Sequence, residues 1–317
     1  LYFTGSKEHN IKLRKLAKKK GLKINEYGLF RKNKCLVGRT EAEIFNKLKL
    51  PFIAPELRED RGEIELGLEG KLPKIIELKD LKGDLHLHSR WSDGEAEIEE
   101  VAKRARAKGY QYIAICDHSE SLKIAGGLSE QRLEEQLKAI GKLNQKLKPF
   151  RILAGSEVDI KSDGSLDYPD KVLKQLDIVV AAIHTGFKQD QEHLTKRIIA
   201  AMENRYVNII AHPTGRLIGQ REPYVLDMEK VLKAAGHTGT FMEISAFPDR
   251  LDLTDVNCLR AKELGVQMAI STDAHTLEHL DFMELGLTVA RRGHLEISDV
   301  VNTLPLKKLL TLLKKKR

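Results

Sequence analysis

The stretch that begins at residue 83 contains the side chains whose types and spacing most directly suggest chemistry. It reads GDLHLHSRWSDG. In a β-strand alternate side chains share a face, so His86 and His88 are expected to point the same way as Asp84, with the intervening leucines on the other face. Neutral ring nitrogens are common ligands of zinc-like metals. The stretch therefore predicts a metal site; the alternative is a half-exposed strand whose polar face carries two histidines.

The strands that must position such a site can be recognised as seven apolar runs separated by amphipathic, charged stretches. The runs span residues 85–87, 112–116, 151–154, 178–183, 207–211, 240–242 and 267–270. Strands that alternate with helical patterns imply a parallel α/β arrangement, either a barrel or an open sheet.

Metal-capable residues lie at or just beyond the carboxyl end of each run. Beyond the first run, they are Asp117, His118, Glu157, His184, His212, Glu243, Asp273 and His275. An open sheet would spread these ends along a line, whereas a barrel brings them to one mouth, where barrel enzymes keep their active sites. A closed or nearly closed barrel is therefore expected.

Nine side chains form the candidate ligand set. They are His86, His88, Asp93, His118, Glu157, His184, His212, Asp273 and His275. Nine ligands exceed the need of one tetrahedral ion, so two or three ions that share bridging carboxylates are expected. Clustered divalent ions suit phosphoester cleavage, because they clamp the attacking and leaving oxygens and activate water. Mixed imidazole and carboxylate donors favour Mn²⁺ or Zn²⁺, with Fe²⁺ as a third option.

One arginine close to this set is a candidate for substrate binding. Arg216 follows His212 by four residues and is a candidate phosphate clamp; the alternative is a surface arginine of a loop.

Composition and charge place the chain among globular proteins with a polyanionic partner. Of the 317 residues, 41% are hydrophobic. The sequence contains no run of about 18 apolar residues, so no membrane helix is predicted. Three widely spaced cysteines and no visible secretory signal favour a reducing, cytoplasmic location. The net charge of +8 is concentrated in lysines and arginines at residues 7–23 and 314–317. Such ends favour nucleic acid, although a solvated helical face is the alternative.

The first eighty residues have a different pattern from the rest. A helix is expected over residues 7–20, capped by Ser6 and ended by Gly21, followed by a strand at 22–24 and a short helix at 42–48. We interpret residues 50–80 as a connector because of their prolines and scattered charges. The expected division is 1–58, a small α+β subdomain; 59–80, a connector; and 81–317, the barrel.

The motifs resemble those of the PHP (polymerase and histidinol phosphatase) metal-dependent phosphoesterases. The match covers residues 83 to about 305 and includes the DLHLH and SDG segments, Asp117-His118 and Asp273-Ala274-His275. The resemblance implies a distorted (β/α)7 barrel with three ions. One ion would bind His86, His88, Glu157 and Asp273; the second Glu157, His184 and His212; and the third Asp93, His118 and His275. Ser245 stands where the family pattern suggests asparagine, and it is assigned no role. Asp84 is assigned none either, beyond orienting a histidine.

The start of the chain resembles the end of a family X DNA polymerase core, its nucleotide-selecting (thumb) subdomain. Tyr2, Phe3 and Gly5 would contact the incoming nucleotide, and Asn10 and Arg14 the minor groove. The match continues through Gly21 to the segment INEY at residues 24–27, which outweighs a tag remnant as the source of the first residues. In that family the catalytic carboxylates precede this subdomain, and no residue precedes Leu1, so templated primer extension by this chain alone is not expected.

Together these resemblances imply a bacterial or archaeal family X repair polymerase fragment with a metal-dependent DNA phosphoesterase. The implied activity is 3′–5′ exonuclease, with abasic-site incision and 3′-end processing, on gapped or single-stranded DNA. Alternatives are a small-molecule phosphatase of the histidinol-phosphate type, an amidohydrolase barrel, and a DNA-binding module with an idle metal site. The partners expected are DNA and the polymerase core, and no membrane.

Overall fold

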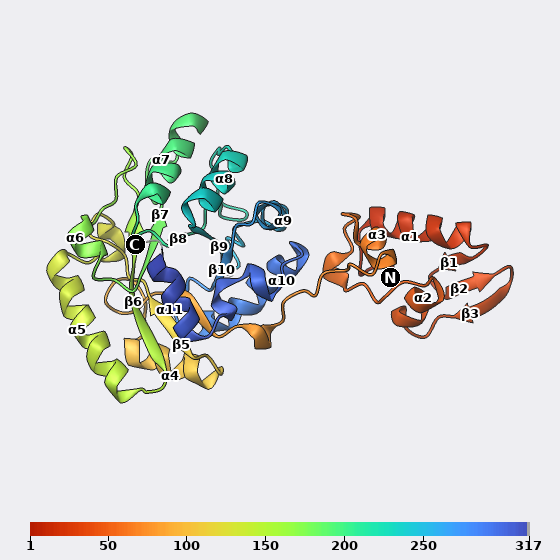
Figure 1. The fold of residues 1–317 in the computed structure, drawn as a ribbon, viewed down its shortest axis with the longest axis horizontal. Helices are drawn as coiled ribbons and strands as arrows, with labels where there is room; N and C mark the ends of the chain where they lie inside the picture. The colour runs from red at the N-terminus through yellow and green to blue at the C-terminus, as the bar shows by residue number, and fades with distance from the viewer. Residues whose placement is uncertain (316–317) are drawn as a thin grey trace. The chain divides into compact units, whose positions relative to one another are not determined.

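The computed structural model describes residues 1–315 and divides the chain into two compact units, Leu1–Ile75 and Ile76–Arg317 (Figure 1). Among these residues no helix is long and apolar enough to cross a membrane. The finer division at residues 58 and 80 stays a prediction. The segment expected to be a connector does contain a short helix, α3 (Glu63–Leu68).

The first unit consists of a small antiparallel sheet, two helices that contact it and a third, short helix. Its elements are α1 (Lys7–Lys19), β1 (Lys23–Asn25), β2 (Gly28–Arg31), β3 (Lys34–Val37), α2 (Glu41–Lys47) and α3. The hydroxyl of Ser6 accepts a hydrogen bond from the backbone N–H of His9, and Gly21 adopts a φ of +68°. The predicted start and end of α1 are therefore confirmed. Leu13, Leu29 and Phe45 are buried in the core between these elements.

The second unit is a nearly closed barrel of seven parallel strands. They are β4 (Gly83–Leu87), β5 (Tyr112–Ile115), β6 (Arg151–Asp159), β7 (Ile178–Ala182), β8 (Ile209–Ile210), β9 (Phe241–Ser245) and β10 (Met268–Ser271), hydrogen-bonded in sequence order. The first and last strands meet beyond β10, where the N–H of His88 donates to the carbonyl of Ala274 at 2.9 Å. The predicted α/β barrel is confirmed.

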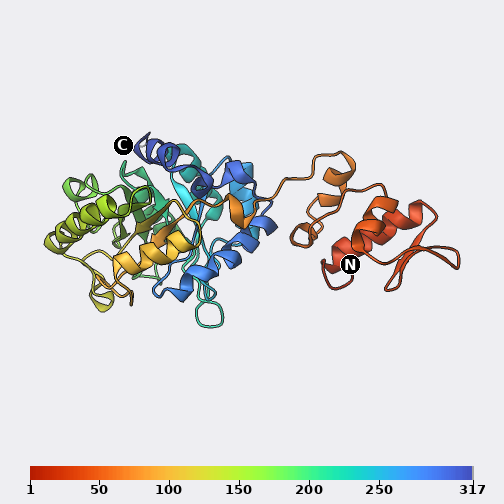
Figure 2. The same ribbon diagram turned by 90° about the horizontal axis from the view of Figure 1, so that it is seen from below.

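Helices cover the outside of the barrel, as both views show (Figures 1 and 2). They are α4 (Ile98–Ala107), α5 (Glu130–Lys146), α6 (Asp170–Leu173), α7 (Gln191–Glu203), α8 (Met228–Thr238), α9 (Asp255–Glu263) and α10 (Met283–Arg292); the last helix is α11 (Leu306–Lys315). Helix α11 closes one end: its Leu309 and Leu313 join the interior cluster with Tyr112 and Phe241, the first residues of β5 and β9. The end that α11 leaves open is therefore the one where the strands' carboxyl ends meet.

One expectation about β4 is wrong. Leu85 packs in the interior cluster, whereas Leu87 packs in the outer cluster between strands and helices, so the two leucines do not share a face. The pairing register of β4 with β5 shifts between Asp84 and Leu87. Such an irregularity inserts a residue into the ladder and changes the alternation of side chains.

Candidate metal centre

The nine candidate ligands lie together at the open mouth of the barrel. His86 and Glu157 belong to strands β4 and β6, and the other seven lie in the segments that follow β4, β5, β7, β8 and β10. Eight of the nine form three adjoining groups, and within each group the potential ligand atoms lie within 4.8 Å of one another. The groups are His86, His88, Glu157 and Asp273; His88, Asp93, His118 and His275; and His118, Glu157 and His184. His212, outside these groups, contacts Glu157. The assignment of particular residues to particular ions stays a prediction.

Glu157, at the centre of the cluster, is in contact with histidines from several strands. Its Oε1 lies 2.8 Å from Nε2 of His212 and 3.2 Å from Nε2 of His184. Its Oε2 lies 3.0 Å from Nδ1 of His118 and 3.4 Å from Nε2 of His86. Burial disfavours the charged carboxylate, but the surrounding imidazoles hold the pKa of Glu157 well below its usual range. Glu157 is therefore ionised and able to bridge.

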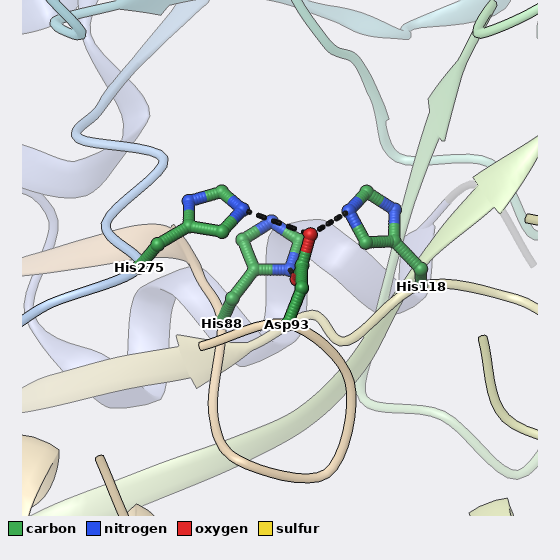
Figure 3. Close-up of side chains that lie close together, drawn as sticks. All are labelled: His88, Asp93, His118 and His275. Carbon is green, nitrogen blue, oxygen red and sulfur yellow. Dashed lines mark ion pairs between the residues drawn. The ribbon is translucent and has the colours of Figure 1, made fainter. Parts of the chain in front are cut away.

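Asp93 brings the loop after β4 to the second group. Figure 3 shows its carboxylate between the rings of His118 and His275, whose Nε2 atoms each lie 3.4 Å from its Oδ2. The ring of His88 stacks on that of His275, with centroids 4.2 Å apart. Asp117 holds this loop in place, because it accepts hydrogen bonds from the N–H of Ser89 and the hydroxyl of Ser92.

The donor set fits divalent metal ions. Nδ1 of His88 and of His212 is buried and has no hydrogen-bond partner among the described residues, although an unsatisfied buried polar atom is costly. Burial and the neighbouring rings of His275 and His118 lower the pKa of His88 to about 3, so its ring is neutral and suited to ligation. A cation would satisfy the imidazoles and the carboxylates at once.

Three histidines of the cluster, His86, His184 and His275, hold protons that an ion must displace. Despite burial, the carboxylates of Glu243 and Glu157 hold the pKa of His86 well above its usual value. Although burial opposes the charge, the carboxylate of Glu157 raises the pKa of His184 to about 10, and Asp93 raises that of His275 to about 9. We expect Mn²⁺ to bind more tightly as pH rises from 6 to 8, by about tenfold per pH unit for each proton displaced. Calorimetric titration in two buffers of different ionisation enthalpy measures this release; identical heats in both would contradict it.

The same shifts give the sign of a stability effect in the ion-free protein. A histidine whose pKa is raised on folding stabilises the fold below pH 6.5, and this contribution disappears as pH rises through 9 to 10. Mn²⁺ should remove this dependence by taking the place of the protons, which thermal unfolding with and without the ion can check.

Several buried acids lie behind the ligands and outside the predicted set of nine. Asp159 accepts a hydrogen bond from Nδ1 of His184, and Glu243 accepts one from Nδ1 of His86. Asp84, expected to orient a histidine ring, instead accepts backbone N–H bonds from His86 and Thr272. In the sequence, the only sign that these acids support the ligands is that each lies within or next to an apolar run.

The arginine predicted as a phosphate clamp is engaged elsewhere. The guanidinium of Arg216 donates to the backbone carbonyls of Arg250 and Leu251 and so fixes the loop after β9. Nε of Arg250, which the sequence did not single out, lies 3.6 Å from Oδ2 of Asp273 at the edge of the cluster. A phosphate contact by Arg216 stays a prediction.

The residues predicted to contact nucleotide lie in the first unit. Tyr2, Phe3, Asn10 and Arg14 line one cavity of about 510 Å³. Gly5 is not among its lining residues; a Cβ there would lie 3.0 Å from Cβ of Arg58, so the position is closely packed. The amide of Asn10 donates to the carbonyl of Gly5, which fixes the turn before α1.

Comparison with known families gives one match for each unit. The family model described as DNA polymerase beta thumb matches residues 1–59, and the PHP domain model matches residues 84–246.

Relatives differ in how much of their length the chain covers. The chain is 46% identical over 316 residues to "DNA polymerase/3'-5' exonuclease PolX" of Bacillus subtilis (strain 168), which matches 99% of the chain but only 55% of that protein. It is 36% identical over 232 residues to a probable phosphatase of Thermoanaerobacter sp. (strain X514), which matches 69% of the chain and 89% of that protein.

A solved structure shares the fold. Histidinol phosphate phosphatase from Lactococcus lactis, crystallised with zinc, L-histidinol and phosphate, aligns with a TM-score of 0.52 at 17% identity. The alignment covers 67% of this chain and 93% of that one.

Proposed function

Because this chain belongs to the PHP domain family and carries a DNA polymerase beta thumb ahead of that domain, we propose that it is a metal-dependent DNA phosphodiesterase that removes nucleotides from 3′ ends. Abasic-site incision and clean-up of blocked 3′ ends are proposed as related activities in repair. The observation that carries the proposal is the ligand cluster around Glu157 in a chain that also contains a thumb. The relative named a 3'-5' exonuclease supports it, although this chain spans about half of that protein.

The proposed cofactors are two or three divalent ions, with Mn²⁺ or Zn²⁺ favoured and Fe²⁺ as the third option. They would be held by the nine ligands, with Glu157 between the groups. When bound, such ions neutralise charge on a phosphodiester and lower the pKa of water. The chain itself supplies Arg250, whose guanidinium contacts the predicted ligand Asp273 and is well placed to meet a phosphate oxygen at that edge.

The proposed substrate is DNA, gapped or single-stranded, and the proposed partner in a longer protein is a polymerase core. The exposed basic residues of α1, among them Arg14, Lys15 and Lys18, support DNA binding. The cytoplasmic location expected from the cysteines stays a prediction; all three are free.

A small-molecule phosphatase is the second candidate. The relatives described as probable phosphatases favour this candidate, because the match covers 89% of the length of the first of them. In that case the metal site would accept a small phosphomonoester rather than the 3′ end of a DNA strand. The thumb and the basic first helix count against it.

We expect the protein with Mn²⁺ to shorten a 5′-labelled oligonucleotide stepwise, giving a ladder that begins at full length. A 3′-labelled copy should release labelled mononucleotide at once, which distinguishes cleavage from the 3′ end from internal cleavage. His88→Ala provides the matched control for contaminating nucleases, since His88 belongs to two of the ligand groups. If no DNA is cut with Mn²⁺, Zn²⁺ or Fe²⁺ while a phosphomonoester is hydrolysed, the phosphatase is the function.

A further inference from the structure

Glu243 is a buried acid of β9 that belongs to no ligand group. Its side chain is fully buried, and its only ion-pair partner among the described residues is the ring of His86. Burying a carboxylate is costly unless it is well hydrogen-bonded. Glu243 meets this condition with both oxygens: Oε1 accepts from Nδ1 of His86 at 2.8 Å, and Oε2 accepts from the backbone N–H of His212 at 2.8 Å.

The first hydrogen bond selects the ring nitrogen that His86 offers to an ion. A carboxylate can only accept, so Nδ1 of His86 is the nitrogen that donates to Glu243, and Nε2 is the nitrogen left to bind an ion once its own proton is displaced. That Nε2 lies 3.4 Å from Oε2 of Glu157 and 3.2 Å from Nε2 of His88. Glu243 therefore turns the ligating nitrogen of His86 toward the centre of the cluster.

The second hydrogen bond holds the backbone of another predicted ligand. His212 has a φ of +27°, which costs free energy for a residue with a side chain and persists only where neighbouring groups impose it. Its N–H is fixed by Oε2 of Glu243, and its Nε2 lies 2.8 Å from Oε1 of Glu157. The same carboxylate therefore sets one ligand from β4 and one from the loop after β8.

We propose that Glu243 is a positioning residue that couples two ion positions, the one that includes His86 and the one that includes His212. The proposal rests on the proposed metal-dependent function but not on the identity of the substrate. It concerns binding of the ions, so a failure to cut DNA would leave it standing. Its distinctive consequence is that one substitution outside the ligand set weakens two ions together.

Glu243→Gln tests this because glutamine keeps the shape but has one oxygen for two donors. Its amide group would face one of the two N–H groups, so either the bond to the N–H of His212 is lost or His86 keeps its bond only by moving its proton to Nε2, the nitrogen that would bind the ion. Asp159→Asn is the matched control, since Asp159 contacts the ring of His184 alone among the predicted ligands. Zn²⁺ or Mn²⁺ retained after dialysis against a series of free-ion concentrations is measured by elemental analysis for both variants and the parent chain.

Outer partners of metal ligands typically contribute about 10- to 100-fold to affinity. We expect Glu243→Gln to lose this factor at two ion positions and Asp159→Asn at one, so the first variant retains less metal per chain. Equal or smaller losses for Glu243→Gln would overturn the coupling.

A second readout reports on the ring itself and does not depend on activity. Long-range ¹H–¹⁵N spectra of the Zn²⁺-loaded protein, labelled at histidine, distinguish the Nδ1–H form of His86 from the alternative. We expect the Nδ1–H signal of His86 to shift or disappear in Glu243→Gln while the signal of His294, a buried histidine outside the cluster, stays in place, which also shows that the variant is folded. An unchanged His86 signal together with unchanged metal content would reduce Glu243 to a packing role.

Discussion

Replacing Glu157 by glutamine is expected to abolish hydrolysis, with a decrease of roughly 1,000-fold or more, equal to about 4 kcal/mol of transition-state stabilisation. Both oxygens of Glu157 contact histidines, among them His184 and His212 on one side and His86 and His118 on the other. Glutamine has nearly the same volume but no charge, so repulsion among these imidazoles and among bound cations is no longer offset. The change is measured as turnover of a 3′-labelled oligonucleotide with saturating Mn²⁺.

Asp273→Ala provides the comparison, because Asp273 belongs to one ligand group whereas Glu157 belongs to two. Both variants should be inactive, but Glu157→Gln should retain fewer ions. Binding of DNA, measured by fluorescence anisotropy in EDTA, should stay nearly unchanged in both. Full activity of Glu157→Gln would contradict the bridging role, and loss of DNA binding would instead favour a structural role for the cluster.

The architecture of the barrel could be predicted because each strand carries its own local signal. A short apolar run followed by a histidine or an acid marks both a buried parallel strand and its functional end. The Asp273-Ala274-His275 segment is an example: Ala274 pairs with Leu87 to close the barrel, and its two neighbours face the cluster. Local signals at each strand end are therefore enough to predict that residues far apart in the sequence meet at one mouth of the barrel.

The features that escaped prediction depend on contacts between strands. The register shift in β4 separates Leu85 from Leu87, and nothing in the sequence of β4 alone requires it. The partner of Glu243 is 157 residues away, at His86, so its role is invisible until β4 and β9 are placed. Arg216 illustrates the same limit, since a loop arginine reaches either a ligand or a backbone carbonyl depending on the neighbouring loop.

Replacing Lys15, Lys18 and Lys19 together by glutamine is expected to weaken DNA binding on the order of 10- to 100-fold at moderate salt. The three lysines are exposed on α1 at a spacing that places them on adjoining turns, while Leu13 and Ala17 face the core. None of the three makes an ion pair within residues 1–315, so they are free to meet phosphates. For each phosphate that the variant no longer neutralises, the slope of log affinity against log salt should fall by about 0.9 for duplex DNA.

The control is a variant with Lys138 and Lys142 of α5 replaced by glutamine, which removes exposed charge from the barrel unit instead, although two charges rather than three and with Lys138 paired to Glu134. Surface substitutions of this kind alter stability by no more than about 0.5 kcal/mol, so both variants should unfold at nearly the parent temperature. Hydrolysis of a small phosphodiester such as bis(p-nitrophenyl) phosphate should be unaffected by the α1 changes, because the ligand cluster belongs to the other unit. If the slope of log affinity against log salt were unaltered in the α1 variant but reduced in the α5 variant, the DNA-binding surface would lie on the barrel unit and not on the thumb.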